Sequence, residues 1–285
     1  MFEKMTETNR FVVAYTQAPT CYPERIVPLK RDWDEEETTY DPPSWTHDIV
    51  LKNAENLSSG NQWADVEKPS PTILGKRRSF NGGIDCPVSE VAKYDSKRAR
   101  YLFPGGRTGL SGRGLLGRWG PNHAADPIVT RYHMGKLQVV LVLRNDGSDE
   151  LAFPGGMVDP GATHTQTLKA EFTQEAAKPG GAVDVLFSTC SRGIVYRGPV
   201  DDWRTTDEAW IETHAEHFHA TDEISDKLDL TTSDPSEVKN VGWYDVDAVT
   251  KMYASHKYWL RLVAAKMSEC AFKLRSSPAY PFGRR

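Results

Sequence analysis

Hydrophobic and polar residues alternate most regularly in the second half of the chain. Residues 127–132 and 137–144 predict two strands, and the second is so continuously apolar that we expect it to be buried on both faces. Amphipathic spacing predicts helices over 163–178 and 247–266, the first with a capping box at Thr163. Further strands are predicted over 183–188, 193–198, 207–219 and 241–245. Strands and helices therefore mix, which predicts an α/β (α+β) sandwich with a mixed sheet.

The first hundred residues lack this regularity and are rich in proline, tryptophan and charge. Tryptophans are rare in disordered tails, so we interpret this region as a small, loop-rich N-terminal lobe that packs on the rest of the chain. The glycine- and arginine-rich stretch 104–121 is either a linker or a rigid loop that presents guanidinium groups to phosphates. We place the lobe at 1–104, the main domain at 105–270 and a C-terminal tail at 271–285.

Composition narrows the possible classes of protein. Hydrophobic residues make up 39% of the 285 positions and aromatic residues 10%, which is typical of a folded globular protein. The net charge of −4 gives no basic excess for binding nucleic acid. The four cysteines form no close pair, as is typical of proteins in a reducing compartment. No apolar run is long enough to span a membrane, and the N-terminus has no apolar signal core. We therefore expect a cytosolic protein. We interpret four histidines as surface residues, because their spacing fits no zinc motif: His214, His217, His219 and His256.

The predicted helix over 163–178 carries the most distinctive chemistry. Its residues Glu171, Gln174 and Glu175 are three and four positions apart and therefore share one face. Two carboxylates on one face form a hard oxygen site suited to Mg²⁺. The spacing alone is also typical of an ordinary solvated helix, because acidic pairs of this kind are common.

The stretch 156–175 resembles the Nudix pattern Gly-x5-Glu-x7-Arg-Glu-apolar-x-Glu-Glu. The matching residues are Gly156, Glu171, Phe172 and Glu175. Three positions differ: Ala162 replaces the first Glu, Ala170 the Arg, and Gln174 the penultimate Glu. The first two changes remove both members of a charge pair and leave no uncompensated partner. The third removes one negative charge, so we expect metal binding to be weakened, and we expect Gln174→Glu to raise activity.

The resemblance extends over nearly the whole chain, from about Tyr22 to about Lys266. It is carried by segments similar to the ADP-ribose pyrophosphatase branch of the Nudix family, a branch that also includes the ADP-ribose-sensing domain of a calcium channel. These segments are 106–114, 120–124, 127–131, 153–161, 200–213 and 252–256. The resemblance implies hydrolysis of ADP-ribose to AMP and ribose 5-phosphate with Mg²⁺, or Mn²⁺ in its place, and a ligand cleft between lobe and sandwich.

The resemblance also implies roles for single residues. Metal ligands would be the carbonyl of Gly155 together with Glu171, Gln174 and Glu175. The candidate general base is Glu212, with Glu216 as a weaker candidate. Candidate substrate-binding residues are Arg107, Arg113, Asn122, His123 and Asp207. Asn122 is equally typical of a residue that caps a turn.

Two hypotheses of different class arise from the altered pattern. In the first, the protein is a working but slowed Mg²⁺-dependent ADP-ribose pyrophosphatase. In the second, it is a module that binds ADP-ribose without cleaving it. Retention of Glu171 and Glu175 favours the enzyme.

Overall fold

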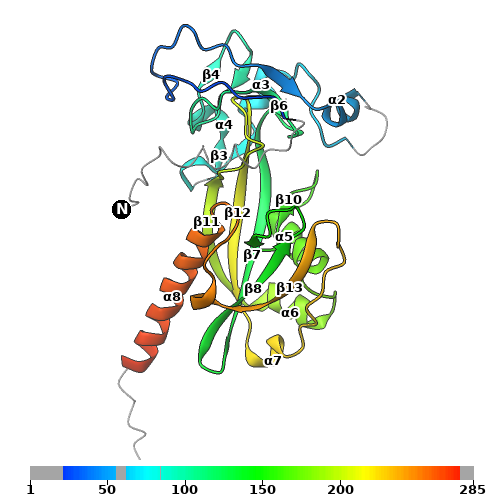
Figure 1. The fold of residues 1–285 in the computed structure, drawn as a ribbon, viewed down its shortest axis with the longest axis vertical. Coiled ribbons are helices and arrows are strands. Elements are labelled where there is room, and N and C mark those ends of the chain that lie inside the picture. The colour runs from blue at the N-terminus through cyan, green and yellow to red at the C-terminus, as the bar shows by residue number, and fades with distance from the viewer. Residues whose placement is uncertain (1–21, 56–61, 84, 277–285) are drawn as a thin grey trace, which may run out of the picture.

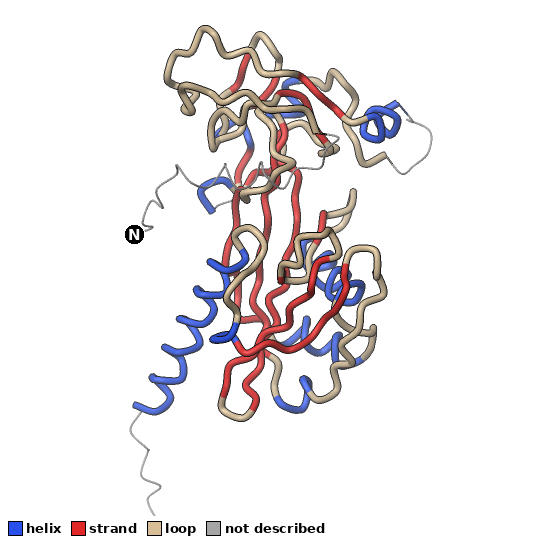
Figure 2. Tube along the Cα trace, in the orientation of Figure 1, coloured by secondary structure: helices blue, strands red, loops and turns tan. Residues whose placement is uncertain are grey.

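The computed structural model describes residues 22–55, 62–83 and 85–276. The molecule is elongated, with the small N-terminal lobe at one end and a strongly twisted sheet flanked by helices at the other (Figure 1). Long strands run from the sheet into the lobe (Figure 2). The two regions are therefore joined by continuous β-structure.

The central sheet is mixed, as the sequence predicts. Its main path is β11-β12-β7-β8-β13, and β10 and β9 add to β7 and β8. The neighbours β7 and β12 are parallel, in a register that runs from Ala209 opposite Gly120 to His219 opposite Thr130, and the other pairs are antiparallel. The strands are β7 (Gly120–His133), β8 (Lys136–Arg144), β9 (Leu151–Ala152), β10 (Gly156–Met157), β11 (Ser191–Pro199), β12 (Ala209–His219) and β13 (Val238–Asp245).

Helices cover both faces of this sheet, which explains why β8 is apolar at nearly every position. Val140 packs in the cluster beneath α5 (His164–Glu175) and α6 (Gly181–Thr189). Its neighbours Val139 and Leu141 pack in the cluster beneath α8 (His256–Ser276) on the opposite face. The short helix α7 (Asp222–Ser225) lies beside α6. Burial of each such side chain contributes roughly 1.5–3 kcal/mol.

Helix α5 begins as its sequence predicts. The Thr163 side chain accepts from the backbone N–H of Gln166, and the Gln166 side chain accepts from the backbone N–H of Thr163. Leu168 and Phe172, one turn apart, are fully buried in the core. The helix ends at Glu175, a few residues before the predicted end.

Two predicted elements are wrong. Residues 183–188 form part of helix α6 and not a strand, because Val183, Leu186 and Phe187 recur at helical spacing and face the core. The predicted helix over 247–266 begins only at His256. The preceding residues form a 3₁₀ turn and then a segment in which Met252 bridges Leu151 of β9.

The N-terminal lobe is built from short elements held together by loops. They are β1 (Ser44–Thr46), α2 (Asp48–Glu55), α3 (Pro71–Gly75), β2 (Arg78–Ser79), η2 (Asn81–Gly83), β3 (Cys86–Pro87), α4 (Val88–Val91), β4 (Tyr94–Asp95), β5 (Arg100–Tyr101) and β6 (Ser111–Gly114). Trp33 donates from its indole N–H to the Phe103 carbonyl at 2.8 Å, and Tyr22 packs edge-on against Trp45. Phe103 in turn packs against Trp210 of β12, so the lobe is folded on the sheet. The exact domain boundaries stay predictions.

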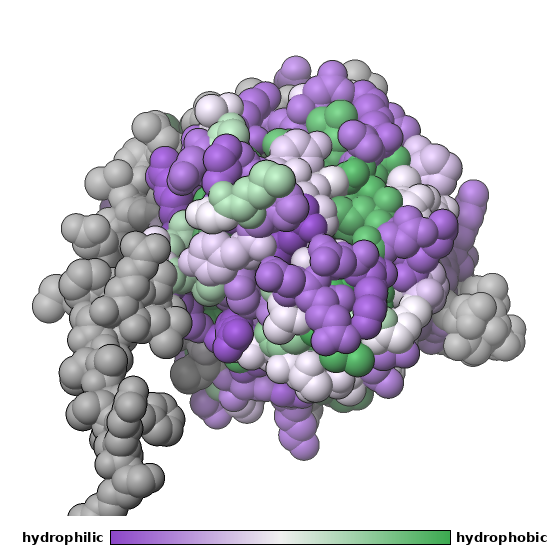
Figure 3. All heavy atoms as spheres, turned by 90° about the horizontal axis from the view of Figure 1, so that it is seen from below, coloured by the Kyte–Doolittle hydropathy of each residue, from purple (hydrophilic) through white to green (hydrophobic). Residues whose placement is uncertain are grey.

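Viewed from the end opposite the lobe, hydrophilic residues cover most of the surface, with smaller hydrophobic patches between them (Figure 3). Within residues 22–55, 62–83 and 85–276, no helix has the length and apolar character needed to cross a bilayer.

Helix α6 can be tested by two neighbouring substitutions. Leu186 is fully buried, whereas Val185 is 45% exposed. We expect Leu186→Ala to lower the free energy of unfolding by about 2–5 kcal/mol and Val185→Ala to change it by less than about 0.5 kcal/mol, measured by urea denaturation. A strand would bury positions 183, 185 and 187 together. If Val185→Ala lowered the free energy of unfolding more than Leu186→Ala does, the result would contradict the helix.

Candidate active site

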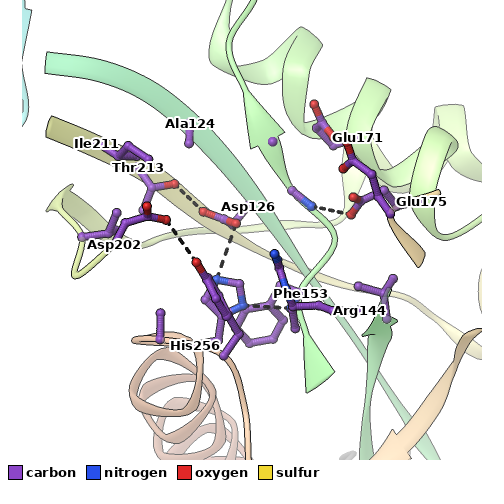
Figure 4. A pocket seen from close by; sticks show the side chains of 18 of the residues that line it. Ala124, Asp126, Arg144, Phe153, Glu171, Glu175, Asp202, Ile211, Thr213 and His256 are labelled. Atoms are coloured by element: carbon purple, nitrogen blue, oxygen red, sulfur yellow. Dashed lines mark hydrogen bonds and ion pairs between the residues drawn. The ribbon is translucent and has the colours of Figure 1, made fainter. Parts of the chain in front are cut away.

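A cavity of about 500 Å³ opens among the strands, loops and helices of the sheet region. All its lining residues lie between Ala124 and Trp259. In the described part of the chain, the lobe contributes nothing to this lining, so the cavity is not the cleft between lobe and sandwich that the sequence predicts. Figure 4 shows Glu171 and Glu175 on one side, Asp202 and His256 on the other, and Asp126 between them.

The first side of the cavity is formed by helix α5 and the loop before β10. Glu171 is half-buried and Glu175 is buried. The backbone N–H of Gly155 donates to Oε2 of Glu175 at 2.9 Å, which fixes the helix against the loop. All four predicted metal-binding residues line the cavity: Gly155, Glu171, Gln174 and Glu175.

Two glycines allow this close approach. A Cβ atom on Gly155 would lie 2.3 Å from Oδ1 of Asp126, and one on Gly156 would lie 2.4 Å from Oε1 of Glu171. Both distances are far below van der Waals contact, so a larger residue at either position would displace a carboxylate.

Asp126, on β7, lies at the centre of the cavity and is not predicted from the sequence. Its Oδ2 accepts a hydrogen bond from the Thr213 hydroxyl, and its Oδ1 lies 3.8 Å from Nε2 of His256. His256 is buried, and its Nδ1 accepts from the backbone N–H of Phe153 at 3.0 Å. Burial lowers the pKa of His256 to about 3, so its imidazole is neutral. The interpretation of His256 as a surface residue is wrong, and it is wrong for His214 and His217 as well, which are also buried.

The second side of the cavity carries a set of charged and aromatic groups. Arg204 binds Asp202 through two hydrogen bonds of 2.8 Å, and the Tyr253 hydroxyl donates to Asp202 at 3.2 Å. Burial opposes ionisation of Asp202, but Arg204 outweighs it and holds the pKa of Asp202 below its usual value. The guanidinium of Arg144 lies 4.1 Å from the centre of the Tyr253 ring. This wall thus offers both a hydrogen-bond acceptor and a positive charge.

The central carboxylates are difficult to ionise together. Burial, followed by the charges of Glu175 and Glu237, raises the pKa of Glu171 to about 8. Burial raises the pKa of Glu175 to about 7, although the Gly155 N–H opposes the change, and burial also raises the pKa of Asp126 to about 7. A divalent cation would offset the repulsion among these groups.

These residues fit a hard divalent ion that takes only part of its coordination from the protein. Across the residues described, no group of three or more His, Cys, Asp or Glu side chains is arranged to hold a metal ion by itself. Mg²⁺ typically keeps several waters and binds one or two carboxylates together with substrate phosphates. Glu171, Glu175 and the loop carbonyls match that requirement.

The predicted general bases and substrate-binding residues lie away from the cavity. Glu212 is fully buried in β12 and accepts hydrogen bonds from the Ser79 hydroxyl at 2.7 Å, the Trp210 indole at 2.8 Å and the Phe80 backbone N–H. These contacts tie the lobe to the sheet. The weaker candidate, Glu216, pairs with His214 at 3.2 Å. A catalytic role for Glu212 stays a prediction.

The predicted phosphate-binding arginines are both buried within the lobe. Arg107 donates to the backbone carbonyls of residues 30, 32 and 35. Arg113 donates to the carbonyls of residues 65 and 117 and pairs with Glu67 at 3.1 Å. Neither guanidinium faces the cavity, because these backbone carbonyls of the lobe take up its donors.

The remaining predicted substrate contacts also have partners of their own. Asn122 caps its turn, with Oδ1 accepting from the Arg118 N–H at 2.8 Å. His123 stacks on Phe80 with ring centres 4.5 Å apart. Asp207 accepts from the backbone N–H of Thr108 at 2.8 Å, inside the lobe junction. Gln174, the fourth predicted metal ligand, does line the cavity, but it is exposed and its amide donates to Asp234 at 3.1 Å.

Sequence reasoning missed most of the second wall, although signals for it exist. Asp202 and Arg204 lie in the segment 200–213, and Tyr253 and His256 lie in 252–256; both segments carry the family resemblance. Asp126 could have been found as the acid that directly precedes the strand predicted over 127–132. Spacing alone does not connect these residues, because they meet only in the folded chain.

Comparison with known proteins assigns the family. A model of the NUDIX domain matches residues 122–263, and a model of the NUDT9-like N-terminal domain matches residues 26–120. The mitochondrial ADP-ribose pyrophosphatase of Rattus norvegicus is 38% identical over 262 residues, which cover 83% of this chain and 72% of that protein. The chain belongs to the Nudix family.

Two further relatives extend the comparison of this Nudix protein. Putative nudix hydrolase 6 of Caenorhabditis elegans is 42% identical over 237 residues, covering 81% of this chain and 86% of the relative. Transient receptor potential cation channel subfamily M member-like 2 of Nematostella vectensis is 37% identical over 268 residues, covering 85% of this chain but 16% of the channel. The Nudix chain is thus similar both to hydrolases and to part of a channel.

The contacts of Glu212 predict a structural role in the Nudix sheet. Glu212→Gln places an NH₂ group opposite a donor, so we expect the free energy of unfolding to fall by about 1–3 kcal/mol, measured in urea. The matched control is the exposed Glu223→Gln, which loses one surface ion pair with Lys227 and should lower stability by less than about 0.5 kcal/mol. Unchanged stability with lost turnover would instead identify Glu212 as the general base.

The raised carboxylate pKa values predict that stabilisation by metal depends on pH. In the metal-free protein, the pKa values of Glu171 and Glu175 are raised to about 8 and about 7, so the folded state binds extra protons and loses stability as the pH rises from the unfolded pKa of about 4.3 to those values. Mg²⁺ competes with those protons. We therefore expect the rise in Tm caused by Mg²⁺ to be larger at pH 8 than at pH 6. Histidines that titrate in this range affect the samples with and without metal equally, so they do not contribute to the difference between the two. An equal rise at both pH values would contradict this assignment.

Proposed function

We propose that this Nudix protein hydrolyses the diphosphate of ADP-ribose to AMP and ribose 5-phosphate, with Mg²⁺ as its metal and Mn²⁺ as a substitute. The observation that carries the proposal is the meeting of Glu171, Glu175 and Gly155 at one side of a cavity of about 500 Å³. Similarity to the rat ADP-ribose pyrophosphatase supports the choice of substrate.

Glu171, Glu175 and the carbonyl oxygen of Gly155 would hold the metal. When bound, the ion supplies positive charge to the diphosphate and acidifies a water for attack. The Gly155 N–H donates to the Glu175 carboxylate and so restrains its orientation toward the cavity. Because helix α5 offers two carboxylates where the family pattern has three, we expect a reduced rate.

The opposite wall suits the rest of the substrate. Arg144 places a guanidinium on the cavity lining, which attracts a phosphate. Asp202, held by Arg204 and Tyr253, keeps a carboxylate that can accept a hydrogen bond from a ribose hydroxyl. The general base stays a prediction at Glu212.

A second candidate function is binding of ADP-ribose without cleavage. It is favoured by the position of Gln174, which is exposed and bonded to Asp234, and by the similarity to a channel. Intact Glu171 and Glu175 favour the hydrolase. The cytosolic location and the absence of nucleic-acid partners stay predictions from the sequence.

Removal of one carboxylate tests the proposal. Glu175→Gln keeps the shape of the side chain but removes its charge, so we expect turnover to fall by about 100-fold or more. The measurement is the initial rate of AMP formation from ADP-ribose against Mg²⁺ concentration, with Glu223→Gln as the matched control. Wild-type turnover by Glu175→Gln at every Mg²⁺ concentration would show that helix α5 is not the metal site.

A further inference from the structure

Four aromatic rings meet where the lobe contacts the start of helix α5. Phe80 of the lobe is fully buried and stacks on His123 of β7, with ring centres 4.5 Å apart. The ring of His164, the first residue of α5, is centred 5.0 Å from that of Phe80, 5.5 Å from that of His123 and 5.3 Å from that of His214 on β12. These four residues, here called the histidine cluster, therefore join the lobe, the sheet and the helix.

The hydrogen bonds of His214 require its ring to be neutral. The guanidinium of Arg197 can only donate, and its Nη2 lies 2.9 Å from Nδ1 of His214, so this nitrogen carries no proton. The single ring proton is therefore on Nε2, which lies 3.2 Å from Oε2 of Glu216. A second proton, on Nδ1, would break the bond from Arg197 and set two positive charges against each other.

Two more ring nitrogens of the histidine cluster are enclosed. Among the residues that the structure describes, neither Nε2 of His123 nor Nε2 of His164 has a hydrogen-bond partner, although both atoms are buried. Oε2 of Glu212 lies 3.7 Å from the His123 nitrogen and already accepts from the backbone N–H of Phe80. Enclosed polar atoms without partners weaken a folded structure, and a charge on such a ring weakens it further.

Positive groups surround His164. It begins helix α5, where the aligned peptide dipoles present their positive end. Burial, followed by the charges of basic groups on neighbouring strands, lowers the pKa of His164 to about 4. Those groups are His123, His214, Arg197 and Arg78.

The acids that accompany these groups are bound to other partners. Glu212 is held by donors of the lobe and of its own strand. Glu216 accepts from the Ser191 hydroxyl and faces His214, and Asp85 pairs with Arg78. The charges that act most strongly on His164 are those of basic groups, so a proton on this ring meets repulsion without compensation.

We propose that the histidine cluster is an acid-sensitive latch, which ties the first turn of helix α5 to the lobe at neutral pH and releases it when the rings take up protons. On release, His164 reaches water and regains its ordinary pKa of about 6.5. The released state then binds more protons than the latched state between pH 6.5 and pH 4. The latch is therefore intact above this range and weakens as the pH falls through it.

The size of the effect follows from His164 alone. Its pKa is about 4 when latched and about 6.5 when released, so the ratio of released to latched molecules should rise by about 30-fold between pH 8 and pH 5. Leu168 and Phe172 remain anchored in the core, which confines the release to the start of the helix.

The test is hydrogen exchange of the full chain without metal or substrate, at pH 8 and at pH 5. Each observed rate is divided by the intrinsic exchange rate at that pH. The reporter is the amide of Thr167, which donates to the Thr163 carbonyl at 3.0 Å and closes the first turn of α5. The amides of β8 report on opening of the whole fold.

Two variants remove the proton acceptor at the start of the helix: His164→Gln keeps a polar side chain, and His164→Leu replaces it with an apolar one. The matched control is His133→Gln, an exposed histidine at the far end of β7. Other groups that titrate between pH 5 and pH 8 are present in every protein compared, so the difference between wild type and variants isolates His164.

We expect the wild type and His133→Gln to lose protection at Thr167 by about 30-fold from pH 8 to pH 5. The amides of β8 should change by less than roughly threefold, because the core stays closed during local opening. Both His164 variants should lose less than roughly threefold at Thr167, since neither can take up the proton that opens the latch.

Three results would overturn the proposal. These are equal protection of Thr167 at both pH values in the wild type, a loss of the same size throughout β8, or a loss that both His164 variants retain. The measurement involves no hydrolysis, so its failure leaves the proposed function standing. Conversely, a protein that forms no AMP from ADP-ribose would leave the latch unaffected.

Discussion

The cavity depends on how closely the backbone at Gly155 and Gly156 approaches two carboxylates. With no Cβ at either position, the loop fits between Asp126 and Glu171, and the Gly155 N–H reaches Glu175. The same approach buries the acids and sets them against one another, which raises their pKa values. The protein thus gathers carboxyl groups whose ionised form a divalent cation would stabilise, and the bound cation would in turn attract a diphosphate.

Much of the fold can be predicted from local sequence. The continuous apolar run of β8 predicts a strand covered on both sides, and the capping box at Thr163 predicts the start of α5. Helix α6 is not predicted because the stretch 183–188 is short and mostly apolar, so a strand and a buried helix look alike. Helix α8 starts later than predicted because the residues before His256 pack on β9, a contact that periodicity does not reveal.

The residues of the candidate site also fall into those that local sequence predicts and those that it does not. Glu171, Glu175 and Gly155 are predictable because they lie within one contiguous motif, whose spacing fixes a helix face. Asp126, Asp202 and His256 come from separate elements that only the sheet topology brings together. The arginines of the glycine-rich stretch mislead for a physical reason: composition shows that a guanidinium is present, but not that buried backbone carbonyls already bind it. The same limit applies to Gln174, whose partner lies 60 residues away.

The central claim is that a metal binds at the junction of helix α5 and the Gly155 loop. The most direct test is a crystal structure with Mn²⁺ and an ADP-ribose analogue whose bridging diphosphate oxygen is replaced by methylene. We predict an anomalous Mn²⁺ peak bound by Glu171 and Glu175, in contact with the analogue's phosphates. An ion and analogue bound elsewhere, with these two carboxylates unliganded, would contradict the account.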